Sequence, residues 1–187
     1  TAILVTERTP RREPFLYVVV LAALSDGRKE LVALVPGHRE STEAWSAVLR
    51  DLTARGLHAP KLVIGDGHLG IWAGLRNVYP EAEEQRCWNH RIINALDKVP
   101  KRLQAQARLQ LRQIPSAATA QEAERRKATY QPWCHQHGLK DTAMVLDRHW
   151  EQMLTCSRFP TEHWPHLRTS NPIESPFAAL RLRTDAA

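Results

Sequence analysis

The sequence predicts an α/β fold, in which a mixed sheet carries helices on both faces and an all-helical segment is inserted. Three strand-like segments follow one another within residues 2–36. Segments whose apolar residues recur at helical spacing then alternate with two further short strand candidates. In residues 101–159 the β-branched runs disappear and Ala, Gln, Arg and Glu become frequent, which is typical of helices. This order of segments predicts a layered α/β domain with a helical insertion.

The first three segments predict an antiparallel meander. Residues 2–8 and 30–36 have the pattern of strands, and residues 15–24 form a nearly continuous Val-rich run that suits a buried central strand. Asp26 and Gly27 lie between the second and third segments, and an Asp-Gly pair there favours a tight hairpin turn.

Helices and strands alternate after the meander. Ser41 or Thr42 is suited to cap a helix that ends at Gly56. The elements that follow are a buried strand at residues 61–65, a helix that Pro80 ends, a short strand within residues 83–88, and a helix that carries Ile92, Ile93 and Leu96 and ends near Pro100.

The predicted insertion contains three helices, at residues 102–114, 119–133 and 141–156. An irregular aromatic segment follows, and a last helix begins between Asn171 and Pro176. Strands and helices in this order fit an RNase H-like core. We therefore predict the first part of the core at residues 1–100, the helical insertion at residues 101–159, and the end of the core at residues 160–187.

The charge balance favours a polyanionic partner such as DNA. The chain of 187 residues carries 26 basic and 20 acidic residues, which gives a formal net charge of +6. Many basic proteins never bind DNA, so on charge alone an ordinary basic protein stays an equal alternative. Because hydrophobic residues make up 43% of the chain, we expect a packed core.

Cysteine usage and hydropathy predict a cytoplasmic or nucleoid-associated protein. Cys87, Cys134 and Cys156 are odd in number, which does not suit a disulfide framework. The apolar run at residues 15–24 is too short to span a membrane, and early charges are unlike a signal peptide. Because Thr1 leads directly into a strand and the chain stops soon after a helix begins, we expect a fragment or a decayed copy of a longer protein.

Two acidic residues are candidates for a catalytic metal site. Asp66 follows the apolar segment of residues 62–65, so we expect it at the carboxyl end of a core strand, where α/β sheets bind ligands. An Asp-Gly turn without function is the alternative. Glu174 lies at the start of the last helix, where it could hold a metal ion or only cap the helix. Carboxylates presented in this way are suited to divalent metal ions in phosphodiester chemistry.

Ordered segments along nearly the whole chain resemble the transposases of the IS256 or Mutator group, which are bacterial enzymes. The segments are KELVAL, RESTEAW, LRDL, GDGHLGIW, QRCWNH, FPTEHWPHLRTSNPIES and LRLRT. The resemblance implies an RNase H-like core with an Asp-Asp-Glu site, in which Asp66 and Glu174 are two of the three carboxylates. It implies Mg²⁺ or Mn²⁺ as cofactor, metal-dependent DNA cleavage and strand transfer, transposon ends and target DNA as partners, and a homodimer on DNA.

The first carboxylate that the resemblance implies is missing. Its place falls on Thr1 or just before it, and Glu7 is too far along the strand to replace it. Because Mg²⁺ prefers near-octahedral oxygen ligation, two carboxylates should bind it weakly. We therefore predict that this chain is catalytically impaired. The alternative is a non-catalytic DNA-binding remnant of a transposase.

Cys87 and His90 form a Cys-x-x-His motif that the resembling transposases also carry. A structural role is the first interpretation, and a DNA contact by His90 is the second. A zinc site is a third, because Cys134, His135, His137, His149 and Cys156 could supply further ligands, but their spacing matches no compact zinc motif.

Several arginines flank these motifs and are candidates to hold DNA phosphates. An ordinary solvated helix face is the alternative. Arg91 follows His90 directly, and seven basic residues between Lys101 and Lys127 are weaker candidates. The residues that we predict to contact DNA are Arg86, His90, Arg168, Asn171, Arg181 and Arg183.

Overall fold

The computed structural model describes residues 2–8, 16–24, 26–37, 41–67 and 69–171. Within them the chain forms two compact units. The first unit contains the described residues up to Gln85 together with residues 169–171, and the second contains Arg86–Arg168. The fold is mixed α/β, because the first unit is built around a sheet and the second around helices.

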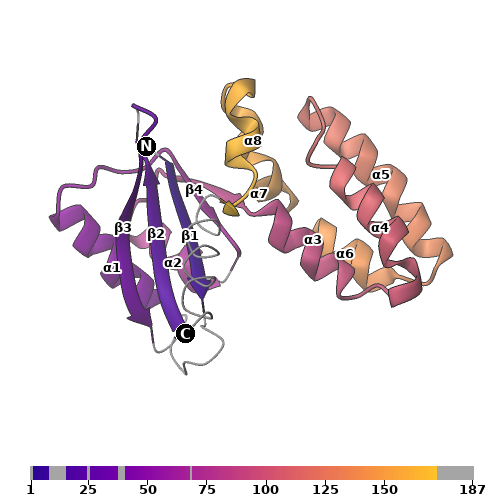
Figure 1. The fold of residues 1–187 in the computed structure, drawn as a ribbon, viewed down its shortest axis with the longest axis horizontal. Helices are drawn as coiled ribbons and strands as arrows, with labels where there is room; N and C mark the ends of the chain where they lie inside the picture. Colours follow the sequence, from indigo (N-terminus) through magenta and orange to yellow (C-terminus); the bar gives the residue numbers. More distant parts are fainter. Residues whose placement is uncertain (1, 9–15, 25, 38–40, 68, 172–187) are drawn as a thin grey trace, which may run out of the picture. The chain divides into compact units, whose positions relative to one another are not determined.

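A mixed five-stranded sheet forms in the described part of the first unit, with its strands in the order β3-β2-β1-β4-β5 (Figure 1). β1 pairs antiparallel with β2 and parallel with β4, and β2 pairs antiparallel with β3, so the predicted meander is confirmed. The strands are Ala2–Arg8 (β1), Leu16–Ala23 (β2), Lys29–Gly37 (β3), Leu62–Gly65 (β4) and Glu83–Arg86 (β5).

The turn between β2 and β3 forms at the predicted Asp-Gly pair. Gly27 has a φ of 85°, a conformation that glycine adopts without steric cost. The amide of Leu24 donates to the carbonyl of Arg28 at 2.9 Å, and the amide of Gly27 donates to the carbonyl of Leu24 at 3.1 Å. These bonds close the hairpin.

Helices α1 (Thr42–Ala54) and α2 (Leu69–Val78) pack against one face of this sheet. Ser41 is the N-cap of α1, since its hydroxyl accepts a hydrogen bond from the amide of Ala44 at 3.1 Å. Gly56 follows the end of α1 with a φ of 94°. The core between helices and sheet contains Val18, Val20, Ala33, Trp45, Val48, Leu49, Leu52, Val63, Ile71, Trp72 and Leu75.

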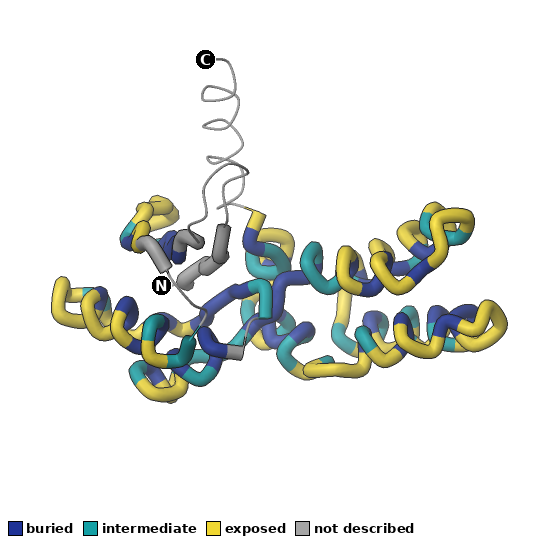
Figure 2. Tube along the Cα trace, turned by 90° about the horizontal axis from the view of Figure 1, so that it is seen from below, coloured by how far each residue is buried: buried dark blue, intermediate teal, exposed yellow. Residues whose placement is uncertain are grey.

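The second unit has a hydrophobic core of its own. Buried positions recur between exposed ones along its helices, as Figure 2 shows. The buried Trp88 side chain crosses this core, and its indole Nε1 donates to the carbonyl of Met153 at 2.9 Å. The helices of eight or more residues in this unit are α3 (Trp88–Leu96), α4 (Lys101–Gln113), α5 (Ala120–Gln136) and α6 (Lys140–Asp147).

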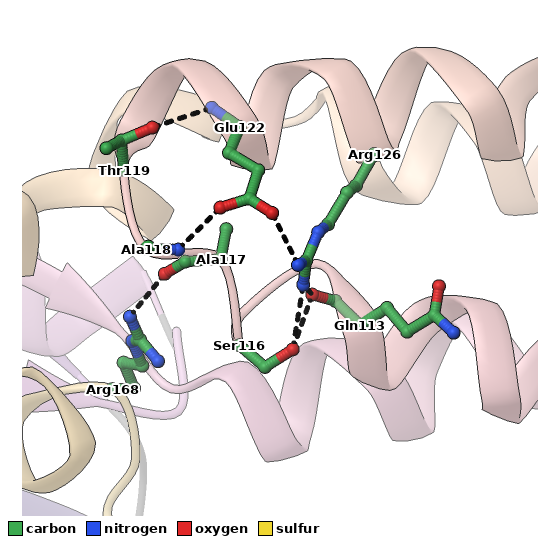
Figure 3. A network of polar contacts seen from close by, with 8 residues as sticks. All are labelled: Gln113, Ser116, Ala117, Ala118, Thr119, Glu122, Arg126 and Arg168. Atoms are coloured by element: carbon green, nitrogen blue, oxygen red, sulfur yellow. Dashed lines mark hydrogen bonds and ion pairs between the residues drawn. The ribbon is translucent and has the colours of Figure 1, made fainter.

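The turn between α4 and α5 is held by side chains that Figure 3 shows. Thr119 caps α5, because its hydroxyl accepts from the amide of Glu122 at 3.0 Å, and the Glu122 carboxylate accepts from the amide of Ala118 at 2.8 Å. Arg126 reaches back from α5 to the other Glu122 oxygen at 2.5 Å, and to the Ser116 hydroxyl at 2.8 Å.

The prediction of one helix at residues 141–156 is wrong. The segment divides into α6, which ends at Asp147, and α7 (Trp150–Leu154), followed by a 3₁₀ turn at Thr155–Arg158. His149 lies between the two helices in the left-handed region, with a φ of 56°. Long-range contacts hold the segment on both sides of the break, because Arg91 donates to the carbonyl of Val145 and Trp150 packs edge-on against Trp88.

Two further expectations concern α3 and the last part of the chain. α3 contains Ile92, Ile93 and Leu96 as expected; Ile92 and Leu96 are buried, whereas Ile93 is 53% exposed. The segment of residues 159–171 contains a 3₁₀ turn (Thr161–His163) and the short helix α8 (Trp164–Leu167). From residue 172 onward, the predicted last helix falls on residues that lie outside the described ones.

Among the described residues, the structure contains no helix with the length and hydropathy needed to cross a membrane. The predicted helical insertion, residues 101–159, lies inside the second unit, which also includes α3 and residues 160–168. α3 belongs to the same hydrophobic core as α4, α5 and α6.

Candidate functional site

Asp66 follows the buried strand β4 directly and is itself half-buried. The next residue, Gly67, has a φ of 107°, which turns the chain sharply away from the strand. Asp66 therefore lies at the carboxyl end of a core strand, as predicted. Ligands of open α/β sheets bind at this end of the strands.

The register between β1 and β4 decides which β1 residue lies nearest to Asp66. Ala2 pairs with Leu62 and Leu4 pairs with Ile64. Continued by two residues, this register would bring Thr6 level with Asp66.

The remaining acidic candidate, Glu174, lies outside the described residues, as do Arg181 and Arg183. Asn171 is described and exposed. Within the described part of the chain there is no group of three or more His, Cys, Asp or Glu residues that could hold a metal ion. Of the two predicted acidic ligands, Asp66 is thus the one that lies within the described residues.

The Cys-x-x-His motif forms the start of α3 in the second unit. Cys87 is the N-cap residue; its side chain is buried, and its carbonyl accepts from the amide of Arg91 at 3.1 Å. The amide of Trp88 donates to the carbonyl of Arg168 at 2.9 Å. His90 follows on the first turn of α3 and is half-buried. The motif thus links the start of α3 to the end of the same unit.

Three arginines from separate elements lie close enough to repel one another. Arg86 ends β5 and is buried, Arg91 lies on α3, and Arg148 is the exposed C-cap residue of α6. Burial and the positive charges of Arg86 and Arg148 lower the pKa of Arg91 to about 10. The Arg91 guanidinium donates to the carbonyl of Val145 at 2.7 Å, which holds it at the last turn of α6.

Such a concentration of positive charge is suited to an anion. Sequence reasoning did not single out Arg148, because it falls in a segment predicted as one continuous helix. Only the packing of α6 beside α3 reveals that it belongs with Arg86 and Arg91.

Arg168 has a structural environment within the second unit. Its guanidinium donates to the carbonyl of Ala117 at 2.9 Å, and it lies over the Trp164 ring at 5.3 Å from the ring centroid. Figure 3 shows this bond beside the α4–α5 turn. A DNA contact by Arg168 would compete with these interactions.

The cysteines that the zinc interpretation requires are buried thiols. Cys87, Cys134 and Cys156 are all free and buried, and burial raises the pKa of Cys134 and of Cys156. Because zinc binds the thiolate, a raised pKa disfavours it as a ligand. The structure offers no support for a zinc site among its described residues.

Comparison with known proteins gives a consistent result. The family model described as "Transposase, Mutator family" matches residues 6–187. The chain is 42% identical over 173 residues to the transposase for insertion sequence element IS6120 of Mycolicibacterium smegmatis, which covers 92% of this chain and 53% of that protein. It is also 42% identical to the transposase for IST2 of Acidithiobacillus ferrooxidans, covering 89% of this chain and 56% of the relative.

A shorter match, 30% identical over 84 residues, is to the transposase for IS256 in transposon Tn4001 of Staphylococcus aureus, covering 45% of this chain and 22% of that protein. The chain spans about half the length of the relatives from Mycolicibacterium smegmatis and Acidithiobacillus ferrooxidans. The family match extends over both units and includes Asp66 and the Cys-x-x-His motif, and on this evidence the chain belongs to the Mutator family of transposases.

Proposed function

We propose that this chain is the catalytic-core portion of a Mutator-type DNA transposase, with an RNase H-like sheet, and that its own catalytic activity is impaired. The observation that carries the proposal is the sheet order β3-β2-β1-β4-β5, with β1 parallel to β4 and Asp66 at the carboxyl end of β4. This order agrees with the RNase H-like arrangement expected from the sequence. It provides a strand end where a carboxylate can meet a ligand.

The partner in this proposal is DNA, first the transposon ends and then the target, with a homodimer as the working form and the bacterial nucleoid as its location. The names of the relatives, all transposases for insertion sequence elements, support this partner. Arg86, Arg91 and Arg148 provide concentrated positive charge for a phosphate. His90 and Asn171 remain proposed contacts, as do Arg181 and Arg183.

Metal-dependent DNA cleavage and strand transfer are the proposed reaction class. When bound, Mg²⁺ or Mn²⁺ would activate the attacking hydroxyl and stabilise the leaving oxygen. Asp66 and Glu174 are the proposed ligands that this chain retains. Because Mg²⁺ prefers more oxygen ligands than two carboxylates supply, we propose that the chain binds the ion weakly and cuts DNA poorly.

Restoring the missing carboxylate tests this proposal. Mn²⁺ binding by calorimetry and Mn²⁺-dependent nicking and joining of DNA would be measured for the unchanged chain, Thr6→Asp, Thr1→Asp, and Thr6→Asp combined with Asp66→Ala. Because the β1–β4 register, continued two residues past the pair Leu4 and Ile64, would bring Thr6 level with Asp66, we expect Thr6→Asp to gain metal affinity and activity. The combined variant should lose both gains.

The remaining variants separate the alternatives. If only Thr1→Asp gains activity, the transposase proposal stands, but β1 must pair with β4 in a register shifted by about five residues. If the variants all bind DNA and none binds Mn²⁺ or cuts, the chain is a non-catalytic DNA-binding remnant. If the unchanged chain and its variants neither bind nor cut DNA, the proposal is wrong.

A further inference from the structure

Helix α4, Lys101–Gln113, differs from its neighbours in its charge. It carries four basic residues and no acidic residue. Lys101, Arg102, Arg108 and Arg112 are all exposed. Within the described part of the chain none of these four side chains forms an ion pair, so their charge faces solvent uncompensated.

Three of these residues form a straight row along the helix. At about 100° and 1.5 Å per residue, Lys101, Arg108 and Arg112 fall within a sector of about 40° and span about 17 Å. Ala107 and Leu111, which are fully buried in the core of the unit, lie roughly 80–120° around α4 from the row. The core contact therefore turns the basic row outward. Ala105, also exposed, occupies the gap between Lys101 and Arg108.

On the neighbouring helix α5, two basic residues form ion pairs within the unit. Arg126 pairs with Glu122 at 2.5 Å, and Lys127 pairs with Asp147 at 2.9 Å. Lys127 also lies over the Trp150 ring, 4.3 Å from its centroid. These two cations stabilise the helical unit itself, so they are not available to a partner. Arg125 on α5 is exposed as well. Of these two helices, however, it is α4 that carries three exposed basic residues in one row.

We propose that the outer face of α4 is a contact surface for the DNA backbone, with Lys101, Arg108 and Arg112 binding phosphates about two to three nucleotide steps apart along one strand. This deepens the proposed function, because it rests on DNA as the partner and assigns part of its binding to the helical unit. Charge complementarity supports DNA as the occupant, since a duplex strand carries one charge per roughly 3.4 Å. The spacings within the row, about 10.5 Å and 6 Å along the axis, are close to three and two such steps.

The salt dependence of DNA binding tests this surface. Binding of the full chain to a random-sequence duplex would be measured over a series of NaCl concentrations. The test variant combines Lys101→Gln, Arg108→Gln and Arg112→Gln, and Gln keeps the helix propensity high. The matched control combines Arg50→Gln, Arg125→Gln and Lys140→Gln, which removes the same charge from exposed positions on other helices. A third variant, Ala105→Lys, fills the gap in the row.

Each phosphate contact contributes about 0.9 to the slope of log affinity against log salt. We expect the α4 variant to lose about 2.7 of this slope, Ala105→Lys to gain about 0.9, and the control to keep the slope of the unchanged chain. Equal losses in the α4 variant and its control would overturn the α4 surface and leave DNA as the partner of the chain. If the unchanged chain shows no salt-dependent binding, both this inference and the proposed DNA partner fail.

Discussion

Because Gly74 has no Cβ atom, α1 and α2 can pack closely at this position. It lies on α2, and a Cβ atom at this position would be 2.8 Å from the Cβ of Trp45 and 3.1 Å from the amide nitrogen of Ser46, both on α1. Neither neighbour is the end of a flexible side chain, so neither can move without shifting α1. The contact is part of the core that supports β4 and therefore Asp66.

We predict that Gly74→Ala destabilises the chain. Overpacking typically costs about 1–3 kcal/mol, while alanine regains about 1 kcal/mol in helix propensity, so a net loss is expected. Urea unfolding would measure it. Asn77→Ala, at an exposed position of the same helix, is the control and should be neutral or slightly stabilising. A rise in stability for Gly74→Ala would show that the helices can separate at no cost.

At the scale of elements, side chains at the α4–α5 turn cap α5 and also bond to residues far away in the chain. The Glu122 carboxylate accepts from Ala118 and from Arg126, and Arg126 also donates to the carbonyl of Gln113 on α4. These bonds, the Ala118 amide first and the Arg126 guanidinium second, lower the pKa of Glu122. The α4–α5 turn also holds Arg168, whose guanidinium donates to the carbonyl of Ala117.

The lowered pKa predicts how stability depends on pH. A carboxyl whose folded-state pKa lies below its unfolded value contributes stability above the unfolded pKa and loses it as pH falls through the folded value. For Glu122 this loss should begin near the ordinary value of 4.5 and continue below it. We expect Glu122→Gln to flatten the stability curve in this range, measured by thermal unfolding from pH 6 to pH 3. If both curves fall equally, other carboxyl groups cause the acid sensitivity.

At the scale of the whole molecule, the second unit has what an independent domain needs. Its core contains Trp88, Tyr130, Trp133 and Leu146, all contributed by residues of the unit itself. The hydrogen bond from the Trp88 amide to the Arg168 carbonyl, at 2.9 Å, joins residues near its two ends. Chain termini that lie close together are common in domains that fold alone.

We predict that residues 86–168 fold without the rest of the chain. The isolated segment should give a helical circular dichroism spectrum and a cooperative thermal transition, with Trp88 and Trp133 reporting burial by fluorescence. Trp88→Phe, which removes the bond to Met153, should lower the transition temperature of the segment. A broad, non-cooperative transition in the unchanged segment would mean that its core depends on the first unit.

Local patterns were enough to predict much of this molecule. The Val-rich second strand, the Asp-Gly hairpin, the Ser41 cap and the place of Asp66 after β4 each follow from interactions within a few residues. Strand composition, turn chemistry and helix caps act at short range, and so they can be recognised in one sequence. The family resemblance, stated from ordered motifs, is confirmed by the match over residues 6–187.

Tertiary structure alone decided the rest, because the responsible contacts join residues far apart in the chain. The helix break at His149 has no Gly or Pro to predict it, and Arg91 bonds to the carbonyl of Val145 close to this break. Arg91 also lies near Arg148, because α3 packs beside α6. The register of β1 against β4 likewise depends on pairing across about 60 residues, and it sets Leu4 opposite Ile64, two residues before Asp66. Short-range patterns specify elements, whereas register, helix breaks and clusters of like charge depend on which elements meet.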